Sequence, residues 1–155
     1  MNNAHPVHPA LKGAMDARGF TALTDVQAEV SAPDYVDKDL LVSARTGSGK
    51  TVAFGLALAD SLLDSGSNSQ LIGPHAIVIA PTRELALQVH KELSWLYADT
   101  GLIIGSSVGG MDPRAERRAL DRGIHILVGT PGRLVDHLMR HSLDLAEIKA
   151  VVLDE

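Results

Sequence analysis

The sequence contains no cysteine, which excludes disulfide bonds and cysteine-based metal sites. No apolar run approaches the roughly 18 residues that a membrane helix needs. The first six residues also lack the charged and apolar regions of a secretory signal, so we expect a cytoplasmic protein without membrane contact. Positive charge is scarce too, because 19 acidic residues outnumber 14 basic ones and give a net charge of −5. This balance argues against a broad electrostatic attraction to nucleic acid, so any such contact must be local.

The length of 155 residues fits one domain, and we expect residues 1–8 to be disordered. A helix is predicted from Pro9 until Gly19 ends it. A second helix is predicted from an N-cap at Thr24 to about Ala32. Gln27 falls in its first turn, where its amide could pair with an adenine edge or could simply face solvent.

A glycine-rich stretch follows an apolar run and precedes a helical pattern. The run at 39–44 predicts a strand covered on both faces, as in a parallel sheet. Glycines between a strand and a helix let main-chain N–H groups surround an anion at the helix start. Here Lys50 would reach the β- and γ-phosphates of a nucleotide, and the Thr51 hydroxyl would hold Mg²⁺. The stretch consists of Ala44, Arg45, Thr46, Gly47, Ser48, Gly49, Lys50 and Thr51.

Four further strands are predicted, at 75–80, 102–108, 124–129 and 150–153, with helices between them. Polar residues that follow two of these strands would lie at one sheet edge, where ligands bind in open α/β folds. There they could contact a phosphate backbone, although Thr82 and Arg83 could equally be an ordinary helix cap and a solvated charge. These residues are Pro81, Thr82 and Arg83 after one strand, and Thr130, Pro131, Gly132 and Arg133 after another.

The last strand is followed by two carboxylates. Asp154 could bind Mg²⁺, and Glu155 could accept a proton from an attacking water. The alternative is that both are frayed, solvated residues at the end of the chain. The helix predicted at 112–122 is rich in charge and is expected to be a solvated outer helix with weak potential for phosphate contact. None of the seven histidines has metal-ligand spacing, so we assign none of them to a metal site.

Taken in order, these motifs resemble the N-terminal RecA-like domain of a DEAD-box ATP-dependent RNA helicase. The resemblance runs from about Leu11 onward and rests on Phe20…Gln27, 44–51, 81–85, Gly109-Gly110, 130–133 and 152–155. It implies a three-layer α/β P-loop NTPase fold, with a parallel sheet, helices on both faces and the last strands missing. Residues 9–155 would form part of this domain, and a second RecA-like domain would be absent from the chain.

The resemblance also implies roles for these residues. Phe20 and Gln27 would belong to the adenine site, so that ATP is preferred. Lys50, Asp154 and Glu155 would be catalytic, with Thr51 and Asp154 holding Mg²⁺. The RNA path, along which the backbone of single-stranded or duplex RNA binds, would be lined by Pro81, Thr82, Arg83, Gly109, Gly110, Thr130, Pro131, Gly132 and Arg133.

The chain departs from the family pattern at several positions. No aromatic residue precedes Phe20, which predicts weak adenine affinity. Asp37 stands where the family usually has glycine. Gly129 stands where the family usually has alanine, and this second change predicts a small loss of packing. Because the chain ends at Asp-Glu, we expect it to bind nucleotide without useful ATP hydrolysis or unwinding, and to expose an apolar edge at 151–153. Another P-loop NTPase, such as a DNA helicase, and a non-catalytic nucleotide- or protein-binding fragment remain alternatives.

Overall fold

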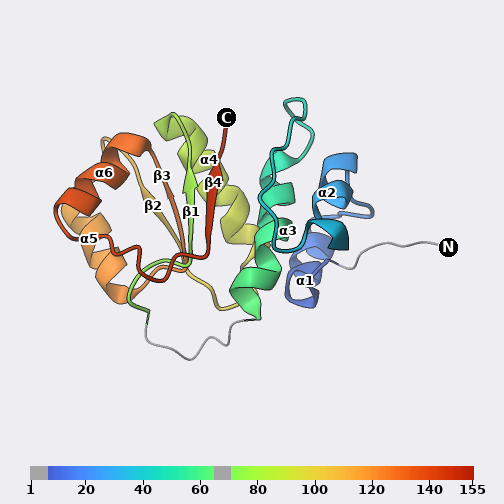
Figure 1. Ribbon diagram of the computed structural model, residues 1–155, viewed down its shortest axis with the longest axis horizontal. Coiled ribbons are helices and arrows are strands. Elements are labelled where there is room, and N and C mark those ends of the chain that lie inside the picture. Colours follow the sequence, from blue (N-terminus) through green and yellow to red (C-terminus); the bar gives the residue numbers. More distant parts are fainter. Residues whose placement is uncertain (1–6, 65–70) are drawn as a thin grey trace.

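The computed structural model describes residues 7–64 and 71–155 and shows a four-stranded parallel sheet between two layers of helices (Figure 1). The strands are β1 (Ala76–Ile79), β2 (Ile104–Ser107), β3 (Ile126–Gly129) and β4 (Ala150–Leu153), in the order β2-β3-β1-β4. Ile77 of β1 lies opposite Leu127 of β3 and Val151 of β4. The predicted α/β architecture is therefore confirmed, and four of the five predicted strands are found.

Helices cover both faces of the sheet, as Figure 1 shows. On one side lie α4 (Arg83–Leu96) and α3 (Lys50–Leu63), with α1 (Pro9–Ala17) and α2 (Asp25–Val30) outside them. On the other side lie α5 (Pro113–Arg122) and α6 (Pro131–Met139). A 3₁₀ helix, η1 (Pro33–Tyr35), follows α2. Among the described residues no helix is long and apolar enough to cross a membrane.

Strands β1 and β3 alternate their side chains between two apolar cores. Val78 of β1 and Val128 of β3 pack with Val89 and Leu93 of α4 in the larger core. Leu127 of β3 packs in the smaller core, where its partners include Ile77 of β1 and Leu134 of α6. Both faces of β1 and β3 are thus buried, which explains why these segments are continuously apolar.

The strand predicted at 39–44 is wrong, since the structure has no strand there. Leu41 is fully exposed at 102%, although the apolar run predicted cover on both faces. A strand requires a neighbour for its main-chain hydrogen bonds. β4 pairs with β1 alone among the described strands, and the 39–44 segment lies toward α2 instead, where it lines a cavity. Hydropathy identified an apolar segment but could not tell whether a strand lay beside it.

Two departures from the family pattern have local explanations. Asp37 has a φ of 59°, a left-handed conformation that favours glycine, so a glycine there would relieve the backbone. At Gly129 an added Cβ would lie 2.6 Å from Leu134 Cδ2 and 2.8 Å from the Ser107 carbonyl oxygen. The space for an alanine methyl is already filled in this chain, so the predicted loss of packing is wrong.

The structure tests only part of the prediction that residues 1–8 are disordered. Residues 1–6 lie outside the described residues, whereas Val7 and His8 are described. His8 is the N-cap of α1 and accepts a hydrogen bond from the Ala10 N–H through Nδ1, at 3.2 Å. For His8, therefore, the prediction of disorder is wrong, because its ring fixes the start of a helix.

His125, next to β3, predicts a pH-dependent stability. Its Nδ1 accepts a hydrogen bond from the Ile103 N–H at 2.9 Å. Burial lowers its pKa below 6.5, and the nearby His75 lowers the pKa further. The unfolded chain therefore takes up this proton first, so this contribution to stability is complete above pH 6.5 and is lost as the pH falls toward the folded pKa.

We expect urea unfolding to show a lower free energy at pH 5.5 than at pH 7.5, and His125→Asn to reduce that difference. Asparagine keeps an acceptor for the Ile103 N–H but does not titrate. An equal pH dependence in both proteins would contradict the assignment to His125.

Candidate functional site

The glycine-rich turn at 44–51 leads directly into α3. Gly47 and Gly49 have φ values of 80° and 85°, in the left-handed region that glycine adopts without strain. Gly49 is the N-cap of α3 and no side chain caps this helix, in contrast to α2, α4 and α5, which Thr24, Thr82 and Asp112 cap. The N–H groups of its first turn are consequently available to an anion, which the helix dipole also favours.

Gln27 lies against this turn. Its side chain is 1% exposed, so the interpretation of Gln27 as a surface residue is wrong. Its Oε1 accepts the Thr24 N–H at 3.0 Å, and its Nε2 donates to the Gly49 carbonyl oxygen at 3.2 Å. A Cβ at Gly49 would collide with the same Nε2. α2 is thereby connected to the turn, and the Gln27 amide keeps one donor and one acceptor position unused.

Polar groups inside the turn suit a phosphate and a hard cation. Lys50 Nζ donates to the Ala44 carbonyl oxygen at 2.9 Å, so its charge is held over the turn. Ser48 Oγ is buried and has no partner among the described residues, and buried hydroxyls are rarely left so. Thr51 offers a half-buried hydroxyl in the first turn of α3. Hydroxyl and carboxylate oxygens are the ligands that Mg²⁺ prefers, so the residues present fit this ion.

The carboxylates after β4 complete this region. Burial raises the pKa of Asp154, and the charge of Glu155 raises it further, whereas the positive charge of Lys50 partly opposes both. Lys50 and Asp154 are thus close enough to interact although they are far apart in the sequence. Glu155 is exposed, with a φ of 68°.

A cavity of about 750 Å³ opens beside the turn. It lies between α2, η1 and the 40–44 segment, and Thr24, Tyr35 and Ser48 are among its lining residues. Phe20, the other residue predicted for the adenine site, packs on Trp95 of α4 with 5.6 Å between ring centroids. The structure therefore places Phe20 partly buried against the larger core, next to α4, while Gln27 lies at the turn.

Three predicted backbone-binding segments meet at the carboxyl end of the sheet. Arg83, in the first turn of α4, donates to the Gly109 carbonyl oxygen at 3.3 Å. Gly110 has a φ of 81°, and a Cβ there would collide with Arg83 Nη1. Arg133, in the first turn of α6, donates to the Met111 carbonyl oxygen at 3.1 Å. Both arginines therefore hold the 109–111 loop, one from each side.

A buried ionic network centred on Glu116 lies next to the 109–111 loop, and the sequence did not predict it. Glu116 of α5 is 7% exposed, and its Oε1 lies 2.8 Å from both Arg133 Nη1 and His137 Nε2. Its Oε2 accepts the Val108 N–H at 3.0 Å. The prediction of a solvated helix at 112–122 is therefore wrong for Glu116. Nothing in the local sequence distinguishes this glutamate from its exposed neighbours.

At the carboxyl end of the sheet, the polar groups that have no hydrogen-bond partner among the described residues differ from those that the sequence predicted. The Arg133 guanidinium, 13% exposed, is bound to Glu116 and Met111. The hydroxyl of Thr130 does not cap α6, so the first turn of α6 also lacks a side-chain cap. Thr82 does cap α4, accepting the Leu85 N–H at 3.2 Å, as predicted. Pro81, Pro131 and Gly132 are exposed around these helix starts.

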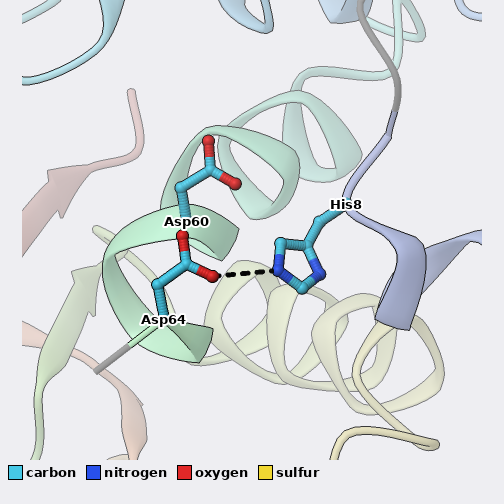
Figure 2. Close-up of side chains that lie close together, drawn as sticks. All are labelled: His8, Asp60 and Asp64. Carbon is cyan, nitrogen blue, oxygen red and sulfur yellow. Dashed lines mark hydrogen bonds and ion pairs between the residues drawn. The ribbon is translucent and has the colours of Figure 1, made fainter. Parts of the chain in front are cut away.

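A second group of side chains lies far from this edge. Figure 2 shows His8, which precedes α1, beside Asp60 of α3 and Asp64, the C-cap residue of α3, a grouping that sequence spacing did not predict. Because His8 Nδ1 accepts the Ala10 N–H, the ring proton is on Nε2, which faces Asp64 Oδ1 at 3.3 Å. This nitrogen has no lone pair for a metal, so the arrangement is a contact that joins α1 to α3.

The fold and this turn define a P-loop α/β protein, and comparison with known proteins specifies the family. The family model for DEAD/DEAH box helicases matches residues 24–155. Proteins named ATP-dependent RNA helicase RhlB are similar to this chain over 153 residues, at 41% identity in Shewanella piezotolerans and 42% in Shewanella oneidensis. The chain belongs to the DEAD/DEAH box helicase family. The match covers 97% of this chain, which spans 35% of the length of these relatives.

Proposed function

We propose that this chain is the ATP-binding, RecA-like domain of an RNA helicase that couples ATP hydrolysis to local unwinding of RNA duplexes. The observation that carries the proposal is the uncapped start of α3, where a hydrogen bond joins Gln27 to Gly49 of the turn at 47–50. Membership of the DEAD/DEAH box helicase family supports the same proposal and does not favour another P-loop enzyme or a binding fragment. In the whole protein, a second RecA-like domain would close over this one.

The phosphates would bind at the first turn of α3, with Lys50 moving from the Ala44 carbonyl oxygen to the β- and γ-phosphates. Thr51 and Asp154 would hold Mg²⁺, which when bound neutralises charge on the phosphates. Glu155 would orient and deprotonate the attacking water. Gln27 would use its remaining donor and acceptor for the adenine edge.

RNA would bind across the loops at 81–83, 109–110 and 130–133. The uncapped N–H groups of α6 and the free Thr130 hydroxyl are donors for phosphate oxygens. Arg83 and Arg133 would act mainly by fixing the 109–111 loop, because their guanidinium groups are bonded to it. Contacts to the backbone carry little sequence information, so the proposed binding is insensitive to sequence.

Calorimetric titration with ADP and GDP in Mg²⁺ tests the nucleotide site, on this chain and on Gln27→Ala. ADP should bind more tightly than GDP, and the variant should lose that preference. The ratio of the two affinities isolates base recognition, because any damage to the phosphate turn weakens both nucleotides together. An unchanged ratio would assign Gln27 a structural role only, and equal binding by the unmodified chain would contradict an adenine site.

A further inference from the structure

A basic pocket lies between α5 and α6, and none of the roles discussed so far uses it. Its volume is about 340 Å³, and its lining consists of Pro113, Arg114, Arg117, His137, Arg140 and Ser142. Three arginines and no acidic residue line this pocket, although acidic residues outnumber basic ones in the whole chain. Arginines that share a concave site raise the local concentration of anions.

Two of these arginines are not neutralised. Arg114 and Arg117 lie one turn apart on α5, both are exposed, and neither forms an ion pair with a described residue. Arg140 binds Asp136 through Nε at 2.9 Å, which leaves its two terminal nitrogens available. The planar guanidinium groups match the geometry of phosphate oxygens and can donate two hydrogen bonds each.

His137, which also lines the pocket, provides independent evidence that a ligand binds there. This side chain is 1% exposed, and Nε2 must carry the proton that it donates to the Glu116 carboxylate. The other ring nitrogen, Nδ1, is buried without a hydrogen-bond partner in the described structure. Buried polar atoms are seldom left unpaired. A ligand hydroxyl, such as the 2′-hydroxyl of a ribose, would satisfy it.

We propose that this pocket binds a backbone phosphate of the RNA strand beyond the 109–111 loop. The identification of the ligand as RNA rests on the proposed function. It is favoured by position, because α5 begins directly after that loop and Arg114 follows Gly110 by four residues. It is also favoured over an acidic peptide by the lining, which offers Pro113 as its only apolar side chain.

NMR titration of the ¹⁵N-labelled chain tests the proposal with a single-stranded RNA oligonucleotide, a glutamate-rich peptide and inorganic phosphate as probes. RNA should shift the amide signals of 114–117 and 137–142 in the pocket. Shifts at 109–110 and 130–133 report separately on the proposed function. Pocket shifts without loop shifts would therefore keep this inference and contradict the loop site. Loop shifts alone, or no shifts at all, would overturn it.

The other two probes identify the source of the ligand. If the peptide shifts the pocket signals and RNA does not, the pocket is a protein-docking site and the inference fails. If inorganic phosphate at the same concentration shifts them as strongly as RNA does, the pocket binds free anions and the assignment to RNA fails.

Arg117→Gln and its neighbour Arg118→Gln form a matched pair. Both remove one positive charge from exposed positions of α5, but Arg118 does not line the pocket. Arg117→Gln should abolish the pocket shifts and lower the slope of log affinity against log salt by about 0.7, the value for one phosphate contact on a single strand. Arg118→Gln should keep both. Equal slopes for the two variants would show general attraction and overturn the inference.

Discussion

Glu116→Ala should lower the free energy of unfolding by about 3–5 kcal/mol, the usual cost of removing one partner from a buried ion pair. Glu116 accepts hydrogen bonds from Arg133 and from the Val108 N–H. The substitution removes both acceptor oxygens, so Arg133 loses its carboxylate and the Val108 N–H is left unpaired. His137 loses its acceptor as well. An effect of this size is a large part of the stability of an ordinary domain.

Urea unfolding monitored by circular dichroism measures this change. Asp121→Ala is a matched control, since Asp121 is an exposed acidic residue on the same helix, and it should alter stability by less than about 0.5 kcal/mol. Glu116→Gln should fall between the two, because an amide oxygen can still accept the Val108 N–H without the charge. A loss no greater than that of the control would show that the network contributes little to stability.

Lys50→Ala should weaken the binding of Mg²⁺-ADP by roughly 10- to 150-fold, which corresponds to about 1.5–3 kcal/mol for one charge-assisted hydrogen bond. Lys50 Nζ already lies over the turn, 2.9 Å from the Ala44 carbonyl oxygen, so little reorganisation is needed for it to reach a phosphate. Calorimetry measures the affinity. Lys38→Ala, which removes an exposed charge before the turn, should leave it unchanged. Equal affinities for the two variants would show that no phosphate reaches Lys50.

Much of the fold could be predicted because its signals are local. Thr24 and Thr82 are good N-caps at their own positions, and the side chains of both accept an N–H of the helix that follows. The glycines of the turn mark a backbone that other residues adopt only with strain. In these cases the residue and its cause lie within a few positions of each other.

The misses depend on partners that are distant in sequence. The apolar run at 39–44 carries no sign of whether a strand will pair with it, and none does among the described residues. The burial of Glu116 depends on Arg133 and His137 of another helix. The burial of Gln27 depends on a hydrogen bond to Gly49. In the sequence, Glu116 and Gln27 are recognisable only as polar residues on a helix, because the partners that bury them lie elsewhere in the chain.

The strand order also determines when the sheet can assemble during synthesis. β1 pairs with β3 and β4, and β2 pairs with β3 alone among the described strands, so the pairing partners of both early strands come later in the chain. No strand pair can form until the ribosome has made β3, and synthesis of the 50 residues from Ala80 to Gly129 takes roughly 2.5 to 10 s at usual translation rates. During that time the apolar segment of β1 emerges without a partner. A nascent chain of this protein therefore depends on its helices, or on chaperones, to keep Ala76–Ile79 from aggregating before the sheet exists.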